Sequence, residues 1–285
     1  MIKHILVPTD FSDCALNALE YALKFAKQIN PKAEITILNA YTIPLAYADF
    51  NIAYDVGESE EDIKKFINSE FDKIEKKVPL IKEFEYETVK TENYVKDAVE
   101  EYCLENDVDL IIMGTKGASG VDEVILGTNA HRVIKAELAP VLVIPEDAEY
   151  EDIKNIALSS DYKGIIAELL SPVKAIRQAY ASEIHLIHVS TEPMLDKEKA
   201  EEAKNLELHL KGLPHQYHFM VNKNVEEGID EFAEKNKIDL LVVLPRKKGL
   251  FESLFGKSES KSLIFHTKVP LLALSASKKK VIEAD

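Results

Sequence analysis

The sequence has little of what marks several protein classes. Its 285 residues include only 10 Gly, 11 Pro and 2 Cys, which excludes a collagen-like or low-complexity chain and a disulfide framework. Its longest apolar runs, such as LIIM and VLVI, are far shorter than the roughly 20 residues of a membrane-spanning helix. Because no basic segment followed by a long apolar run opens the sequence, we expect no signal peptide, no membrane partner and a cytoplasmic location.

Positive charge is also scarce. The chain has 35 Lys and Arg against 50 Asp and Glu, a net charge of −15, which argues against nucleic acid as a partner because basic surfaces bind phosphate backbones. Residues 1–150 hold 15 basic and 29 acidic side chains, a balance of −14, and the remainder holds 20 and 21, a balance of −1. Since a domain has about 150 residues, we expect two domains with different surfaces.

Short apolar runs alternate with longer amphipathic stretches along the chain. Continuous apolar runs are typical of strands buried on both faces, and their alternation with helices implies right-handed crossovers. We therefore expect an α/β fold with a parallel sheet and helices on both faces. In the first half, the predicted strands are residues 4–8, 34–41, 84–90, 109–114 and 141–145.

The second half repeats the order of the first. IKNIALSSD (153–161) resembles IKHILVPTD (2–10), and from Asp109 onward the copies align at a constant offset, so that Asp109 corresponds to Asp239. We expect two tandem five-stranded parallel-sheet domains. The predicted segments are a first domain at 1–147, an acidic linker around 146–152, a second domain at 152–276 and a tail at 277–285.

The first copy is longer than the second by about 21 residues, because Asp10 lies 99 positions before Asp109 whereas Asp161 lies 78 before Asp239. Most of the extra residues fall in 41–62, after the second predicted strand. That position is the carboxyl end of a strand, where open α/β sheets bind ligands. The segment is either a lid or a longer surface connection.

The segment with the most specific chemistry is GTKGASGVDEVILGTN, residues 114–129. Gly114, Gly117 and Gly127, followed by Thr128, have the spacing G-x2-G-x9-G-T between a predicted strand and a predicted helix. Glycines there let the backbone approach a polyphosphate, and amide N–H groups at a helix N-terminus bind anions without cationic side chains. We expect the Thr128 hydroxyl to add a donor and to cap the helix. An ordinary loop with turn glycines is the alternative.

Motifs of ATP-consuming enzymes are missing. The sequence contains no GxxxxGK[ST] loop, no SGGxDS loop, no HIGH pair and no HExxH spacing. Phosphoryl transfer needs positioned metal ligands and a nucleophile. Asp122 and Glu123, inside the glycine loop, either face solvent or approach a Mg²⁺ ion. We therefore expect no catalytic residues, no protein-bound metal site and at most slow ATP hydrolysis.

At this point the sequence resembles the universal stress protein family, specifically its tandem members. The resemblance rests on ILVPTDFS (5–12), the glycine loop and LAPVLVIP (138–145). It implies Rossmann-like domains of the adenine nucleotide α-hydrolase kind, and ATP binding where the glycine motif is intact. It also implies that the closing strands of the two copies pair antiparallel across a pseudo-dyad within the chain; a further homodimer stays open.

The same resemblance assigns residues to an adenine nucleotide. It places Asp10 near adenine and ribose, the Ala40 backbone at adenine, and Met113 below the ribose. Asp10 could instead serve only as a helix cap or turn residue, and Met113 only as core. The full set of nucleotide-binding residues that the resemblance implies is Pro8, Thr9, Asp10, Ala40, Met113, Gly114, Gly117, Gly127, Thr128 and Asn129.

In the second copy the glycine motif is lost: Leu244, Lys247, Lys257 and Ser258 replace Gly114, Gly117, Gly127 and Thr128, although Asp161 persists. Long side chains would fill the space of a phosphate, so we expect a degenerate scaffold domain, with weak anion binding by the basic loop as the alternative. The expected function is an ATP-binding stress-response regulatory protein that holds the nucleotide in its N-terminal domain. A nucleotide-independent scaffold with unknown protein partners is the alternative, and a slow ATPase is less favoured.

Overall fold

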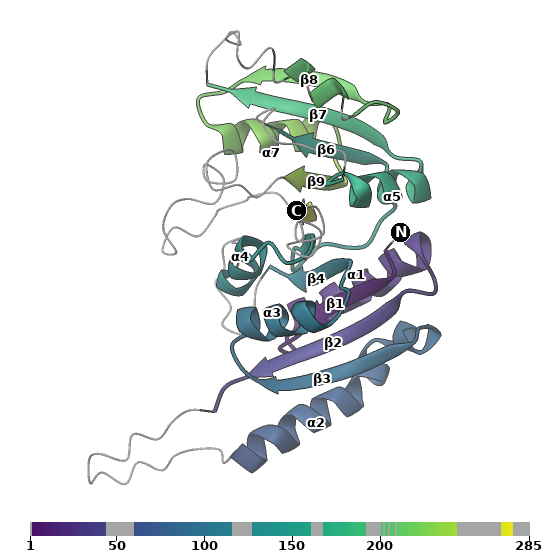
Figure 1. Ribbon diagram of the computed structural model, residues 1–285, viewed down its shortest axis with the longest axis vertical. Coiled ribbons are helices and arrows are strands. Elements are labelled where there is room, and N and C mark those ends of the chain that lie inside the picture. Colours follow the sequence, from purple (N-terminus) through teal and green to yellow (C-terminus); the bar gives the residue numbers. More distant parts are fainter. Residues whose placement is uncertain are drawn as a thin grey trace, which may run out of the picture.

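The structure, a computed structural model, covers both halves of the chain (Figure 1). It describes residues 2–43, 60–115, 127–160, 168–191, 201, 203–204, 206–208, 210–243 and 269–275. The elements of the first half are β1 (His4–Pro8), α1 (Asp13–Ile29), β2 (Glu34–Tyr41), α2 (Glu60–Lys77), the 3-10 helix η1 (Pro79–Glu83), β3 (Tyr86–Glu92), α3 (Val95–Glu105), β4 (Leu110–Gly114), α4 (Thr128–Lys135) and β5 (Val141–Ile144). Those of the second half are β6 (Asn155–Ser159), α5 (Ser171–Tyr180), β7 (Glu183–Ser190), β8 (Gln216–Val221), α7 (Val225–Lys235), β9 (Leu240–Val243) and β10 (Leu271–Ala273).

The strands form one sheet in the order β3-β2-β1-β4-β5-β10-β9-β6-β7-β8. Among the described residues, every strand pairing within a half is parallel, and only β5 and β10 pair antiparallel. Each half is thus the predicted five-stranded parallel sheet. In the first half the chain moves outward from β1 to β2 and β3 and then returns to the other side of β1. The strand order therefore reverses between β1 and β4, where open α/β sheets leave a crevice for ligands.

Helices cover both faces of the sheet, as predicted. One buried cluster joins α1, α2 and α5 to one face through side chains such as Phe25, Ile74 and Ile176. The other face packs against α3, α4 and α7 through side chains such as Val99 and Ile229. The strands inside the sheet read as nearly continuous apolar runs because each one contributes side chains to both clusters, whereas the outer strands β3 and β8 are more exposed.

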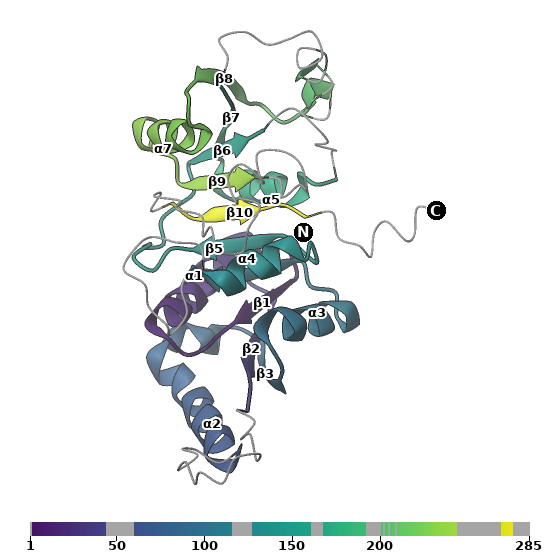
Figure 2. The ribbon, with the colours of Figure 1, turned by 90° about the vertical axis from the view of Figure 1, so that its left-hand side faces the viewer.

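The joint between the halves lies in the middle of the molecule (Figure 2). Leu142 of β5 lies opposite Leu272 of β10, and both side chains are fully buried. The antiparallel pairing of the closing strands, which the family resemblance implied, is therefore present within this chain. Tyr150, in the expected linker, contacts the Tyr21 ring edge-on and shares a 2.7 Å hydroxyl–hydroxyl hydrogen bond with Tyr180, so the linker is packed against both halves.

Equivalent contacts confirm the internal repeat. The Asp109 carboxylate accepts hydrogen bonds from the backbone N–H groups of Lys3 and His4, at 2.7 and 3.2 Å. Asp239 accepts from the N–H groups of Lys154 and Asn155, both at 2.8 Å. In each half, one carboxylate thus ties the start of the fourth strand to the start of the first. α3 and α7 also begin 130 residues apart, at Val95 and Val225.

Some details differ from the sequence expectations or lie outside the described residues. The third strand begins two residues later than predicted, at Tyr86, because 79–83 form a 3-10 helix first. Cys14 and Cys103 are both buried and neither forms a disulfide bond, as expected of small apolar residues. Most of the segment that was predicted to be either a lid or a longer surface connection, residues 44–59, and the tail lie outside the described residues. In the part of the chain that is described, the helices are too short or too polar to cross a bilayer.

Candidate functional site

The predicted residues of β1, β2 and β4 meet at the carboxyl edge of the first half. Pro8 is the last residue of β1 and lies opposite Leu38 of β2, two residues before Ala40. Met113 and Gly114 end β4, which is the other neighbour of β1. These residues therefore lie together at the carboxyl edge of the sheet, where the strand order reverses.

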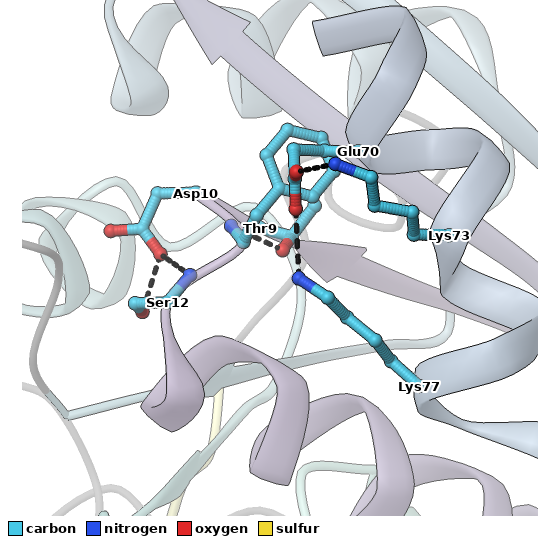
Figure 3. Close-up of polar contacts among 7 residues, drawn as sticks. Thr9, Asp10, Ser12, Glu70, Lys73 and Lys77 are labelled. Carbon is cyan, nitrogen blue, oxygen red and sulfur yellow. Dashed lines mark hydrogen bonds and ion pairs between the residues drawn. The ribbon is translucent and has the colours of Figure 1, made fainter. Parts of the chain in front are cut away.

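The turn after β1 is held by its own polar groups. The Asp10 Oδ1 atom accepts hydrogen bonds from the Ser12 N–H at 3.1 Å and the Ser12 hydroxyl at 2.6 Å (Figure 3). The Ser12 hydroxyl oxygen in turn accepts from the Ala15 N–H at 3.2 Å and caps α1. Asp10 therefore has the turn role that the sequence left open. Its side chain is exposed at the strand edge, so that role is compatible with contact to a ligand.

Thr9 connects the same turn to β2. Its N–H donates to the Leu38 carbonyl at 2.8 Å, which extends the parallel pairing one residue beyond β1. Its hydroxyl oxygen accepts from the Phe11 N–H at 3.0 Å, and Phe11 has a left-handed φ of 63°. Such a conformation is uncommon outside glycine. The turn is thus fixed in shape before any ligand binds.

Asn39 is a site residue that the sequence reasoning missed. Its side-chain amide donates to the Thr9 carbonyl at 2.8 Å, and only 5% of the residue is exposed. Its Oδ1 atom is buried and has no hydrogen-bond partner among the described residues. Buried polar atoms are normally paired, so this oxygen is a free acceptor beside Thr9 and Ala40. The signal was a polar residue on the core face of an apolar strand, in line with Ile35 and Ile37.

Packing contacts that the sequence could not show explain why Gly114 and Met113 occupy their positions. A Cβ atom on Gly114 would lie 2.6 Å from the Cys14 Sγ atom and 3.1 Å from the Cys14 carbonyl oxygen. Close packing of β4 on α1 therefore requires the glycine, whatever binds at the loop. Met113 is 5% exposed and packs with Leu6 and Ala130 in the core, which agrees with the core interpretation left open for it.

The predicted phosphate segment returns to the end of β4. The Gly127 N–H donates to the Thr115 carbonyl at 2.5 Å, so the N-terminus of α4 lies beside the end of β4. Thr128 and Asn129 are exposed in the first turn of α4. The expectation that Thr128 caps this helix was wrong: Gly127 is the N-cap, and it makes no side-chain cap hydrogen bond. The first N–H groups of the helix are therefore not bonded to a side chain of the N-cap residue.

Helix α2 borders the turn on one side. The Phe71 ring contacts the Phe11 ring edge-on, with centroids 5.0 Å apart. The neighbouring Glu70 is largely buried and pairs with Lys77 at 2.8 Å and Lys73 at 2.9 Å (Figure 3). Hydrogen bonds from Lys77 and then Lys73 lower the pKa of Glu70. Both partners keep this carboxylate charged beside the site.

The second half keeps the same carboxyl-edge scaffold. The Ser160 N–H donates to the Ile187 carbonyl at 3.0 Å, as Thr9 does to Leu38. The His188 Nδ1–H donates to the Ser160 carbonyl at 2.8 Å, where Asn39 bonds to Thr9 in the first half. An imidazole thus replaces an amide, and the cross-strand contact is retained.

Several predicted positions fall outside the described residues. They include Gly117, the two loop acids Asp122 and Glu123, and the five second-half positions Asp161, Leu244, Lys247, Lys257 and Ser258. Over the ranges that are described, no three His, Cys, Asp or Glu side chains gather as metal ligands would. His185 and His188 lie on opposite faces of β7, against Phe232 and Phe219 respectively, as the strand period requires.

Comparison with known proteins agrees with this architecture. A sequence profile described as the universal stress protein family matches residues 1–145 and 167–275. A universal stress protein of Methanocaldococcus jannaschii is 31% identical over 147 residues, which are 50% of this chain and 82% of that protein. A universal stress protein of Synechocystis is 23% identical over 291 residues, covering 95% of this chain and 99% of that one.

A solved structure has the same fold over nearly the whole chain. The crystal structure of a universal stress protein from Archaeoglobus fulgidus superposes with a TM-score of 0.70 and 18% identity. It covers 96% of this chain and 99% of its own. The two profile matches, the strand order and this superposition together show that the chain belongs to the universal stress protein family, with two copies of the family domain in tandem.

Proposed function

We propose that the chain binds ATP in its first half and acts as a stress-response regulatory protein of this family. The observation that carries the proposal is the meeting, at the reversal of strand order, of the β1 turn, the end of β4 and the exposed start of α4. Ligands of open α/β sheets bind at this place. The family resemblance supplies the identity of the ligand, because members with an intact glycine motif resemble ATP binders.

The residues present fit an adenine nucleotide in two respects. At the phosphate end, Thr128 and Asn129 belong to an exposed first helical turn, whose N–H groups point out of the helix toward an anion. At the base end, the buried Asn39 Oδ1 atom offers an acceptor for a hydrogen-bond donor such as an amino group. Amide donors also explain how a half with a charge balance of −14 could hold a polyphosphate.

Within this proposal, ATP supplies no chemistry to the protein beyond its own charge and shape. The chain's residues bind and orient it, and occupancy alters the surface that a protein partner meets. We expect a regulatory role without an assigned reaction, with slow hydrolysis at most. A Mg²⁺ ion bound together with the phosphates is compatible with the acids of the glycine loop.

Asn129→Asp tests the site without weakening the helix. A carboxylate in the first turn of α4 favours the helix dipole, so the variant should keep its melting temperature. The same carboxylate repels phosphate, and we expect ATP affinity, measured by isothermal titration calorimetry, to fall about tenfold or more. Asn222→Asp makes the same change in the second half and should bind ATP like the parent chain. Unchanged affinity in Asn129→Asp would contradict the proposed phosphate position.

The ligand itself is tested by mass spectrometry of nucleotides released from the purified chain. ATP at about one hundred times its Kd should add about 2.7 kcal/mol of stability, seen as a higher melting temperature with Mg²⁺ and ATP than with Mg²⁺ alone. A chain that carries no adenine nucleotide and gains no thermal stability would leave the second candidate, a nucleotide-independent interaction protein. The loss of the glycine motif in the second half, where Lys247 and Lys257 replace Gly117 and Gly127, favours that candidate.

A further inference from the structure

Two histidines form a pair beneath α7 in the second half. His185 of β7 and His218 of β8 share a 3.1 Å hydrogen bond between Nδ1 of the first ring and Nε2 of the second. His185 is 7% exposed, and His218 is partly exposed. The Phe232 ring of α7 contacts both imidazoles, with centroids 6.0 and 4.8 Å away. The histidine pair therefore lies between the sheet and the helix that covers it (Figure 2).

The hydrogen bond within the histidine pair requires one ring to accept. A neutral imidazole has one donor and one acceptor nitrogen, whereas an imidazolium has two donors. The bond is therefore lost when both rings are protonated. The His185 Nε2 atom is buried and has no hydrogen-bond partner among the described residues, so a charge on this ring meets no acceptor there. Because an uncompensated buried charge is costly, acid should destabilise the histidine pair.

The groups that face the histidine pair offer little compensation for a positive charge. On β7, Glu183 shares the face of His185, but it is exposed and lies 3.5 Å from the Gln216 amide. On β6, the residue opposite His185 is Ala157. The residues that α7 buries are all uncharged. The charged residues of α7, which lie outside that buried set, are Glu226, Glu227, Asp230, Glu231, Glu234 and Lys235. Burial, followed by the neighbouring His185, lowers the pKa of His218.

The first half has a different arrangement at the equivalent place. Thr36 and Val89 occupy the strand positions of the two histidines, and Tyr102 occupies the helix position of Phe232. The hydroxyls of Thr36 and Tyr102 share a 2.9 Å hydrogen bond, and the His4 imidazole bonds to the Thr36 hydroxyl at 2.9 Å. A hydroxyl oxygen can accept from a histidine N–H in either protonation state. The second half instead bonds one imidazole to another, which makes its contact sensitive to acid.

We propose that the histidine pair is an acid-sensitive switch that controls how tightly α7 packs on β7 and β8. Neutral rings, together with Phe232, hold the helix against the two strands. Protonation places positive charge inside this contact, and a second proton places two like charges a hydrogen-bond length apart. His218 then turns toward solvent and α7 loosens, while the first half keeps its packing. Histidine is the side chain whose ordinary pKa allows such a change between about pH 5 and 8.

Hydrogen–deuterium exchange of the full chain at about pH 7.5 and about pH 5 tests the proposal. Protection factors are compared, because they correct for the intrinsic pH dependence of amide exchange. We expect the protection of α7 and β8 amides to fall about tenfold or more at the lower pH. The amides of α3 and β3, the equivalent elements of the first half, should lose less than about twofold.

Variants separate the histidine pair from other effects of acid. His185→Thr combined with His218→Val copies the residues of the first half, and the fall in protection should disappear in this double variant. His215→Gln is the matched control: it removes a histidine of the same half that lies outside the pair and bonds to the Leu213 carbonyl at 2.8 Å. This variant should keep the response of the parent chain.

NMR titration of the imidazole signals gives a second readout, which a merely structural role would not change. In His185→Thr, the pKa of His218 should rise toward its ordinary value of about 6.5. The proposal is overturned if protection of α7 and β8 is the same at both pH values, or if it falls as much in the double variant or in α3 and β3. An unchanged pKa of His218 in His185→Thr would overturn it as well. None of these measurements involves ATP, so failure of the ATP proposal is separately recognisable.

Discussion

The contact between Gly114 and Cys14 permits a quantitative prediction. Gly114→Ala places a Cβ atom 2.6 Å from the Cys14 Sγ atom and 3.1 Å from its carbonyl oxygen. The thiol can rotate, but the carbonyl belongs to the first turn of α1 and cannot move without that helix. Overpacking of this kind costs about 1–3 kcal/mol. For a chain of this length, the melting temperature should fall by about 2–5 °C.

A double-mutant cycle separates this contact from other effects. Cys14→Ala removes the Sγ atom and leaves the carbonyl, so Gly114→Ala should cost about 1 kcal/mol less in that background. Cys103 is also a buried cysteine, on α3. In the Cys103→Ala background, the cost of Gly114→Ala should be the same as in the parent chain. Urea unfolding of all six proteins gives the free energies.

The reasoning is refuted if Gly114→Ala has the stability of the parent chain. A cost that is the same with and without the Cys14 thiol would contradict the contribution assigned to the thiol and leave the carbonyl contact as the origin. ATP titration of Gly114→Ala adds a second readout: loss of stability with retained affinity would show that the glycine serves packing rather than the phosphate.

Three further predictions concern groups whose environments are defined. Asp109→Asn and Asp239→Asn should each lower the free energy of unfolding by about 1–2 kcal/mol, since each carboxylate accepts two backbone N–H groups, and unequal losses would contradict their equivalence. Burial, followed by the hydrogen bond to Glu87, raises the pKa of Tyr102 to about 12. The protonated Tyr102 hydroxyl should therefore add fully to the free energy of unfolding below pH 10, and this contribution should decline between pH 10 and 12. Urea unfolding of the parent chain and of Tyr102→Phe across this pH range measures the difference. The pKa of His218 is lowered in the folded state, so the neutral imidazole contributes to the free energy of unfolding above pH 6.5, and this contribution is lost as the pH falls below that value. The free energy of unfolding of His218→Phe should therefore fall less between pH 7.5 and 5 than that of the parent chain.

Much of the fold was readable from local pattern. Continuous apolar runs predicted the strands, amphipathic stretches predicted the helices, and the constant offset between Asp109 and Asp239 predicted the repeat that the carboxylate contacts confirm. Helix starts were less readable: only the structure shows that the Ser12 hydroxyl oxygen accepts the Ala15 N–H and caps α1. For α4, Thr128 was predicted to cap, but the helix begins after Gly127.

The location of the candidate site could be predicted from the sequence, but the contacts that explain its individual residues could not. Residues after β1, β2 and β4 meet at one edge because parallel strands end on the same side. The close approach of Gly114 to Cys14 joins residues 100 positions apart, and no local pattern reports such a distance. Asn39 was missed because a single polar residue in an apolar strand is not specific until its hydrogen bond to Thr9 is seen.

By itself, the sequence determined which segments are strands and helices, which of their faces are buried, and that one α/β unit occurs twice. These properties follow from the spacing of apolar residues, since the periods of strands and helices are local. Tertiary structure alone decided the register of β5 against β10, the packing of Gly114 against Cys14, and the Asn39 acceptor that has no partner among the described residues. Each of these depends on which distant atoms come within a few ångströms, and only the packed chain sets those distances.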